Sequence, residues 1–550
     1  METYFTDLKF YRFIRTNQKR KAVIPMGSQA ATFVILAIYV ATMLGIGFYT
    51  SKRTKSTNDF MLGGRNVGSW LTAFSYGTTY FSAVVFIGYA GQFGWSYGVS
   101  ASWIGLGNAF IGSLIPFFLI GKRARLMSKH IDARTMPDFF GKRFDSSALK
   151  TVSALIVFIF LIPYTASVYN GLSRLFGMVF DLGENGATII IIMMAVLSAI
   201  YVTLGGYKAT ALNDFVQGII MLIGIGTVVA LTLQKKNGFT AAVDSLKAMT
   251  DDGKLGSLFG PDPINLLGVV ILTSLGTWGL PQMVQKFYAI KDDQAIKKGA
   301  IISTFFAVVV AGGCYFMGGF IRLYCTLDPA DTSKAFIETG ANGKPVFDTM
   351  VPALLQQALP NILIGLVVVL VLSASLSTLS SLVLTSSSTL TNDLIRPRVK
   401  NFDDKKQMLV MRIFIAVFLL ISVIIACNKN ASISTLMSYS WGALSGAFLG
   451  PFLYSLFLRK ATPAACWVSF CTGIGLTVLH MMLFSLNISA FDGVKQAVAT
   501  CGCPLNLLSP INAGAITMIL SLILVPVVSS FTKAPEKKVV DNAFSSIEAK

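Results

Sequence analysis

The sequence predicts an all-α polytopic membrane protein with about thirteen spanning helices, ten of which form two five-helix halves of opposite topology. The chain of 550 residues is 54% hydrophobic and only 13% charged, whereas soluble domains carry roughly 25% charged residues. Its mean hydropathy is +0.66. Apolar runs of about 20 residues, the length of a spanning helix, recur along the chain. Two of these runs are interrupted at corresponding places in the two halves.

The apolar runs alternate with loops of unequal charge. The runs lie at approximately 28–50, 68–92, 101–121, 150–178, 187–206, 210–234, 264–285, 299–323, 360–392, 408–427, 433–458, 463–486 and 508–531. One set of loops holds 29 of the 45 Lys and Arg residues, and it comprises 51–67, 122–150, the surroundings of 208, 286–298, 393–412, 459–460 and the C-terminal tail. The positive-inside rule places this set in the cytoplasm. The C-terminus is then cytoplasmic, and an odd number of spans puts the N-terminus outside, although residues 1–27 are basic.

Two runs are poorly suited to continuous helices. In the run 68–92, Gly77, Thr78, Thr79, Tyr80 and Ser82 gather near the middle, where glycine weakens a helix and hydroxyls need partners. This pattern favours a helix that unwinds and frees carbonyl oxygens to bind an ion. A glycine-mediated packing face is the alternative.

The run 264–285 carries Gly276, Gly279 and Pro281 around Trp278. Proline removes a backbone hydrogen bond and bends a helix, so this run is either interrupted or simply kinked. Each interrupted run opens a set of five spans. Because five is odd, the two sets enter the membrane from opposite sides, as in transporters built from inverted repeats.

This organisation divides the chain into six predicted parts. They are a basic N-terminal segment (1–27), a peripheral helix with its loop (28–67), the first repeat (68–263), the second repeat (264–460), two peripheral helices (461–531) and a cytoplasmic tail (532–550).

The run 372–393 contains more hydroxyls than a lipid-exposed helix tolerates. On a 3.6-residue period one face carries Ala374, Ser377, Thr378, Ser381, Thr385 and Ser388. Small oxygen donors on one face suit a hard cation that sheds its water. Close helix packing, for which Ser and Thr are common, is the alternative.

Several functional classes fit the sequence poorly. The two histidines, His130 and His480, are far apart, and the spans hold no paired carboxylates, so we do not expect an enzyme or an organic cofactor. The net charge of +19 is scattered over loops and implies no nucleic-acid partner.

A channel would need a continuous polar lining, and a solute sensor would usually add a soluble domain. No obligate protein partner is evident.

Several motifs together resemble the sodium:solute symporter family from about residue 28 to 531. They are FMLGGRNVGSW (60–70), FIG (86–88), GGYKATALNDFVQGIIML (205–222), WGLPQMVQKFYAIKD (278–292), STLSSLVLTSSSTLTNDL (377–394) and SYSWGALSGAFLGPFLYSLF (438–457). Segments 164–176 and 438–451 look most like sodium/proline symporters, whereas 205–224 and the GLPQ…KD segment look more like sodium/pantothenate symporters. The resemblance implies a leucine-transporter-like fold in the plasma membrane.

The resemblance also implies which residues bind Na⁺. The family's sodium site matches backbone carbonyls of Thr78, Phe81 and Ala374 and hydroxyls of Ser377 and Thr378. Asp214 matches an aspartate near the ion exit route, and Ser381 lies close to a possible second ion. Members with a second sodium have a serine where this chain has Ala374, which weakens that possibility. The helix dipole offers another explanation for Asp214, near the start of its span.

For the solute, the resemblance implies a small organic molecule imported with Na⁺ by alternating access, with a proline-like amino acid or pantothenate favoured. A sialic acid, a short monocarboxylate or a sensor role are the alternatives. The candidate pocket residues are Tyr80, Ser82, Val85, Tyr164, Trp278, Pro281, Gln282 and Trp441. Proline symporters have an aspartate at the position of Tyr80, and sugar symporters a glutamine at that of Val85. Sialic acid symporters use an arginine in the fourth span, where only Arg174, near the outer end, occurs.

Overall fold

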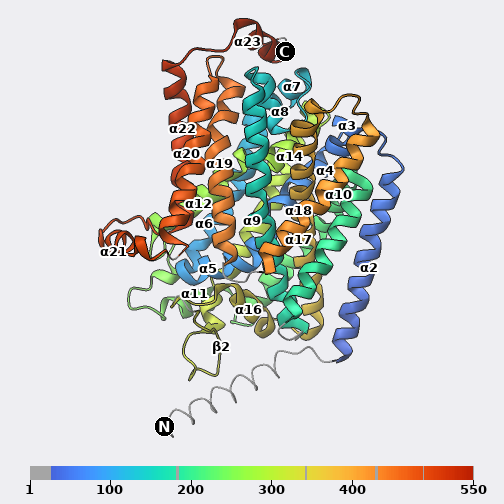
Figure 1. Ribbon diagram of the computed structural model, residues 1–550. Coiled ribbons are helices and arrows are strands. Elements are labelled where there is room, and N and C mark those ends of the chain that lie inside the picture. The colour runs from blue at the N-terminus through green and yellow to red at the C-terminus, as the bar shows by residue number, and fades with distance from the viewer. Residues whose placement is uncertain (1–25, 181–184, 341–342, 428–431, 487, 549–550) are drawn as a thin grey trace.

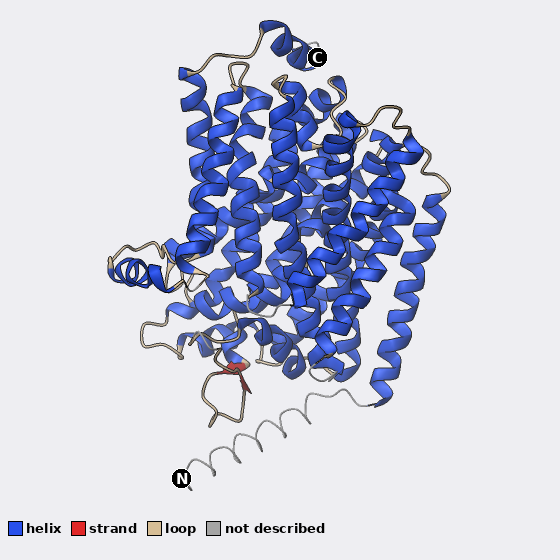
Figure 2. Ribbon diagram, in the orientation of Figure 1, coloured by secondary structure: helices blue, strands red, loops and turns tan. Residues whose placement is uncertain are grey.

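The protein is a bundle of long helices that run roughly parallel to one another (Figure 1, Figure 2). The computed structural model describes residues 26–180, 185–340, 343–427, 432–486 and 488–548. Within these residues one small sheet joins strand β1 (Cys325–Thr326) to β2 (Ala335–Phe336) in parallel. Of the predicted basic segment 1–27, residues 1–25 lie outside the described part of the chain.

The helices have the following bounds. In the first half they are α2 (Met26–Ser51), α3 (Thr57–Leu62), α4 (Ser69–Tyr80), α5 (Ala90–Tyr97), α6 (Ser102–Ala109), α7 (Lys122–His130), α8 (Met136–Arg143), α9 (Ser147–Phe180), α10 (Gly186–Gln234) and α11 (Phe239–Lys247). In the second half they are α12 (Pro263–Gly279), α13 (Pro281–Ala289), α14 (Asp293–Ala307), α15 (Gly313–Gly318), α16 (Met350–Ala358), α17 (Asn361–Thr389), α18 (Asp404–Cys427), α19 (Ile433–Phe457), α20 (Pro463–Phe484), α21 (Asp492–Thr500), α22 (Pro510–Phe531) and α23 (Lys537–Glu548). Short 3₁₀ or π-helical segments connect or extend them, at η1 (Gly63–Arg65), η2 (Val84–Tyr89), η3 (Gly98–Ala101), η4 (Phe110–Leu114), η5 (Phe117–Gly121), η6 (Lys254–Gly256), η7 (Val308–Gly312), η8 (Ile321–Leu323), η9 (Phe347–Thr349), η10 (Leu390–Ile395), η11 (Arg396–Arg398) and η12 (Ser489–Phe491).

The number of spanning helices differs from the predicted thirteen when it is counted by length and apolar composition. The described residues contain nine such stretches, or ten when α12 and α13 count as one bent span. Two stretches, Val84–His130 and Gly186–Gln234, have 47 and 49 residues, roughly twice the length that one crossing needs. Within the second, Gly206 has a φ of 56° and breaks the helix between the predicted spans 187–206 and 210–234. The figure of thirteen is therefore not confirmed.

The first interrupted helix is broken where the sequence predicts. Helix α4 ends at Tyr80, and Phe81 is extended, with φ −106° and ψ 91°. The backbone N–H of Val84 donates to the Ser82 hydroxyl at 3.2 Å, so Ser82 caps the segment that restarts after the break. The chain then continues through η2 into α5.

The second interruption is a break rather than an ordinary kink. Helix α12 ends at Gly279, Leu280 is extended with φ −78° and ψ 123°, and Pro281 begins α13. The two helices meet at an angle of 47°. Proline fits the first position of α13 because that position needs no N–H donor.

The two interrupted helices run in opposite directions. The N–H of Val67, just before α4, donates to the Ala289 carbonyl at 3.1 Å, and the N–H of Lys291 donates to the Val67 carbonyl at 3.1 Å. The start of the first interrupted helix thus lies beside the end of the second, as inverted halves require. Both points lie near α7 and α8, at the end of the bundle that also carries α23, which we call the α23 end (Figure 1).

Glycine-mediated packing, the alternative considered for the run 68–92, also occurs in it. Gly77 lies in α4 so close to the ring of Phe306 in α14 that an added Cβ would overlap the ring.

We expect Gly77→Ala to lower the free energy of unfolding by about 1–3 kcal/mol through overpacking, measured by thermal unfolding in detergent. Gly45→Ala is the matched control, because a Cβ at Gly45 would meet nothing within 4 Å. Equal unfolding midpoints for the two variants would contradict this account of α4 packing.

Candidate functional site

The break in α4 leaves carbonyl oxygens that no longer have partners in their own helix. The hydroxyls of α17 meet them. Ser377 Oγ donates to the Thr78 carbonyl at 3.0 Å, and Thr378 Oγ1 lies 3.3 Å from the same oxygen. Thr378 Oγ1 is also 3.1 Å from the carbonyl of Thr79. All four side chains are buried. The interrupted helix and the hydroxyl-rich helix therefore touch at the point where α4 stops.

The carbonyl of Ala374 belongs to the same cluster. It lies 3.0 Å from Ser377 Oγ and 3.1 Å from Thr378 Oγ1. Four of the five predicted sodium-binding residues thus come together through their oxygens, and the fifth, Phe81, is the extended residue at the break itself. We call the set formed by Thr78, Ala374, Ser377 and Thr378 the oxygen cluster.

The oxygen cluster has the chemistry of a site for a hard cation. Its donors are neutral carbonyl and hydroxyl oxygens, which suit alkali and alkaline-earth ions rather than soft metals. The hydroxyls now donate to carbonyls, but each can rotate and present a lone pair to an ion. No group of three or more His, Cys, Asp or Glu side chains suited to a metal occurs in the described residues. The assignment of Na⁺ to this cluster stays a prediction.

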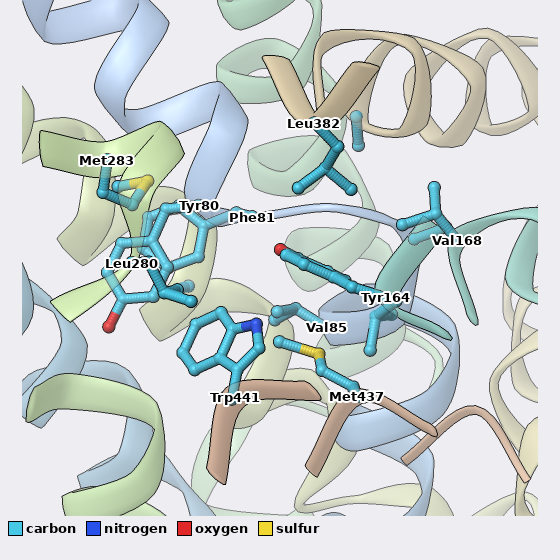
Figure 3. Packing of buried hydrophobic residues seen from close by; sticks show 14 of the residues in the cluster. Tyr80, Phe81, Val85, Tyr164, Val168, Leu280, Met283, Leu382, Met437 and Trp441 are labelled. Carbon is cyan, nitrogen blue, oxygen red and sulfur yellow. The ribbon is translucent and has the colours of Figure 1, made fainter. Parts of the chain in front are cut away.

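Beside the oxygen cluster, buried aromatic residues fill the centre of the bundle (Figure 3). The Trp441 ring of α19 lies between Tyr80 and Tyr164, with ring centroids 6.1 Å and 5.9 Å away. Tyr80 stacks on Phe81 at 4.2 Å, and Val85 lies close to Trp441 in the same view. Four of the predicted pocket residues, Tyr80, Val85, Tyr164 and Trp441, therefore form one cluster next to the break in α4.

The other predicted pocket residues are placed differently. The indole N–H of Trp278 donates to the Ile111 carbonyl at 2.9 Å, so Trp278 interacts with η4. Ser82 caps the segment after the break, as described above, and its side chain also neighbours Tyr164. Pro281 and Gln282 begin α13 immediately after the second break, and both are buried. Gln282 Oε1 is a buried atom for which the described residues provide no hydrogen-bond partner, and Trp441 Nε1 is buried beside the Tyr164 side chain.

A second polar cluster lies one helical turn from the oxygen cluster, and sequence reasoning missed its central residue. Lys286 Nζ donates to Ser75 Oγ at 2.7 Å and to Ser381 Oγ at 3.0 Å, and it lies 3.9 Å from Asp214 Oδ2. Ser75 Oγ donates to Asp214 Oδ2 at 2.5 Å. We call Lys286, Ser75, Asp214 and Ser381 the lysine cluster.

Lys286 does not lie in the loop predicted at 286–298, so this predicted boundary is wrong. The apolar run ends before Lys286, but α13 continues to Ala289 and its lysine is buried, with 3% of the side chain exposed. The apolar residues Phe287, Tyr288 and Ala289, which follow the lysine directly, indicate that the helix continues, but no local signal identifies the partners that let the lysine be buried. The predicted exit-route residues Asp214 and Ser381 both contact Lys286. Their role in ion passage stays a prediction.

Two oppositely directed, interrupted helices, with oxygen donors at the first break, define a membrane transporter with the leucine-transporter-like inverted repeat. Comparison with known proteins gives the family. The sodium:solute symporter family matches residues 60–473. The chain therefore belongs to this family, and it is a sodium-coupled symporter and an integral membrane protein.

Relatives and solved structures agree with this membership. The chain is 29% identical over 511 residues to the osmoregulated proline transporter OpuE of Bacillus subtilis, covering 92% of this chain and 95% of that protein. It is also 29% identical over 448 residues to a sodium/proline symporter of Staphylococcus aureus, covering 79% and 82% of the two chains. Among solved structures, the substrate-bound outward-open state of a Na⁺-coupled sialic acid symporter is similar, with a TM-score of 0.68, 18% identity and coverage of 92% and 99%. That likeness concerns the fold alone.

Proposed function

We propose that this symporter imports L-proline together with Na⁺ across the cytoplasmic membrane. Two relatives that match most of the chain are named as proline transporters. The observation that carries the coupling is the contact of Ser377 and Thr378 with the freed carbonyl of Thr78. Na⁺ bound there would join α4 to α17 next to the aromatic cluster.

The aromatic cluster suits a small amino acid with an apolar ring. Tyr80, Tyr164 and Trp441 provide flat apolar surfaces, and the two tyrosine rings lie 6.1 Å and 5.9 Å from the Trp441 ring. The Trp441 N–H, which neighbours the Tyr164 side chain, would serve as a donor for a carboxylate, and the unpartnered Gln282 Oε1 as an acceptor for an ammonium. A buried donor or acceptor that lacks a partner destabilises the protein, so a ligand group that pairs with either atom is favoured.

In the proposed alternating-access cycle, Na⁺ controls the contact between α4 and α17. With Na⁺ bound, the freed carbonyls of α4 and the hydroxyls of α17 are held together, and the solute is enclosed beside them. Release of Na⁺ would loosen this contact and free the solute. One charge crossing 100 mV supplies about 2.3 kcal/mol, and a roughly tenfold Na⁺ gradient adds about 1.4 kcal/mol. With one Na⁺ per neutral solute, about 3.7 kcal/mol supports roughly 500-fold accumulation.

The charge distribution supports a cytoplasmic α23 end. The basic loops that sequence analysis grouped together include 122–150 and 459–460, which meet at this end. Arg459 there forms ion pairs with Asp541 and Glu548 of α23. Loops rich in Lys and Arg stay in the cytoplasm, so the C-terminus is assigned to the cytoplasm and the start of α2 to the opposite side.

Uptake of radiolabelled L-proline into proteoliposomes tests the proposal. We expect an inward Na⁺ gradient to drive uptake and a K⁺ gradient of the same size to have no effect. Unlabelled L-proline should compete, whereas pantothenate, short monocarboxylates and sialic acid should not. Absence of Na⁺-driven L-proline uptake, together with Na⁺-driven uptake of radiolabelled pantothenate by the same proteoliposomes, would overturn the proline assignment and favour the second substrate suggested by the segment 205–224.

A further inference from the structure

We propose that the ammonium group of Lys286 occupies a second cation position in this chain, so that the protein binds one Na⁺ and not two. This inference rests on the proposed Na⁺ site, because the lysine cluster adjoins the oxygen cluster. It concerns the number of ions and not the identity of the solute.

The geometry of the lysine cluster is that of a cation surrounded by oxygens. Lys286 Nζ has Ser75 Oγ at 2.7 Å, Ser381 Oγ at 3.0 Å and Asp214 Oδ2 at 3.9 Å. These oxygens come from α4, α17 and α10, so the lysine joins three helices from its position on a fourth, α13. The face of the Tyr207 ring, 5.2 Å from Nζ, adds a further favourable contact for a cation.

Burial and charge leave no place for a further positive ion in this cluster. The side chains of Lys286 and Asp214 are 3% and 1% exposed, and they are the two charged groups of the lysine cluster. Their charges cancel. A Na⁺ ion added beside them would give a buried cluster a net positive charge, which is strongly unfavourable away from water. Without the lysine, the same oxygens would surround an unpaired carboxylate, and a free cation would be attracted in its place.

Thr79 connects the two clusters, which explains why the lysine affects the ion site. Thr79 Oγ1 lies 2.8 Å from Ser381 Oγ in the lysine cluster. The carbonyl of the same residue accepts a hydrogen bond from Thr378 in the oxygen cluster at 3.1 Å. The tethered cation and the proposed Na⁺ therefore lie on neighbouring oxygens of α4 and α17. The Na⁺ ion can leave with the solute, whereas the ammonium group cannot, because it is covalently part of Lys286.

Equilibrium binding of ²²Na⁺ to the purified full-length protein in detergent tests the inference. Na⁺ is the only ligand used, so the count does not depend on whether L-proline is the solute. We expect one Na⁺ per wild-type chain and two for Lys286→Ser, which removes the charge and adds an oxygen. Lys286→Arg is the matched control: it keeps the positive charge and should still bind one. The double change Lys286→Ser with Asp214→Asn should also return the count to one, because the carboxylate charge is lost.

A second measurement separates the two positions. The double change of Ser377 and Thr378 to Ala should bind no Na⁺, and adding Lys286→Ser to it should restore one ion. If Lys286→Ser does not yield folded protein, Lys286→Gln takes its place, because it keeps most of the side chain and loses the charge. Two Na⁺ ions on the wild-type chain would overturn the inference. It would also be overturned by a single Na⁺ on folded Lys286→Ser and Lys286→Gln.

Discussion

Replacing both Ser377 and Thr378 with Ala is expected to abolish Na⁺-driven uptake while leaving the protein folded. Each hydroxyl offers the ion an oxygen, and a hydrogen-bonding contact with a charged group contributes about 1.5–3 kcal/mol. Loss of both should cost about 3–6 kcal/mol, which is roughly two to four orders of magnitude in Na⁺ affinity. The measurement is the Na⁺ concentration for half-maximal uptake in proteoliposomes.

Ser375→Ala is the control for this prediction. Ser375 lies on the same helix and is equally buried, but its hydroxyl donates to the Val371 carbonyl of its own helix at 2.7 Å. Its removal should leave the Na⁺ dependence unchanged. The assignment of the oxygen cluster would be wrong if the Ser377 and Thr378 double variant kept the wild-type Na⁺ dependence, or if Ser375→Ala lost it.

The second large effect is expected at the α23 end, where Lys150→Met should lower the free energy of unfolding by about 3–5 kcal/mol. Lys150 Nζ lies 2.7 Å from Asp138 Oδ1 and 3.5 Å from Asp393 Oδ1, and the two aspartate side chains are 4% and 0% exposed. Removing the lysine leaves two buried carboxylates facing each other. Thermal unfolding in detergent, compared with wild type, measures the loss.

Lys142→Met provides the matched control, because Lys142 is the other partner of Asp138. Its side chain is 38% exposed, compared with 19% for Lys150, and it lies 3.1 Å from Asp138 Oδ2. Exposed pairs contribute about 0–1 kcal/mol, so the control should lose little stability. Burial alone would raise the pKa of Asp138, but Lys150 and Lys142 outweigh it and hold that pKa below its ordinary value. Equal losses of unfolding free energy for Lys150→Met and Lys142→Met would contradict the conclusion that Lys150 compensates the buried carboxylates of Asp138 and Asp393.

The sequence predicts both helix breaks because each has a local cause. Around Tyr80, glycine and hydroxyl residues gather where a spanning helix would carry apolar ones, and the break follows at Phe81. Around Leu280, flanking glycine and proline weaken the helix on both sides. The hydroxyl face of the run 372–393 is also predictable from a 3.6-residue period. It lies against α4 and α13, where Thr385 donates to Gln285 Oε1 at 2.7 Å.

What the sequence could not predict depends on partners far away in the chain. Lys286 is buried because Asp214 and Ser75, on two other helices, compensate its charge. Trp278 contacts the Ile111 carbonyl because a π-helical segment presents that oxygen. For Lys286, a span boundary drawn from local composition misplaces the side chain. For Trp278, local composition does not indicate the distant partner, and its place in the solute pocket stays a prediction. The division into repeats at 68–263 and 264–460 stays a prediction in its exact bounds.

The proposed transport cycle depends on one event, the joining of α4 to α17 by Na⁺ at the break after Tyr80. A cryo-electron microscopy map of the full-length protein in saturating Na⁺, paired with one in choline, tests it most directly. We predict a density feature in the Na⁺ map alone, within coordination distance of the Thr78 and Ala374 carbonyls and the Ser377 and Thr378 hydroxyls. Identical maps at this position, or an ion bound elsewhere while these oxygens remain bonded to one another, would contradict the account.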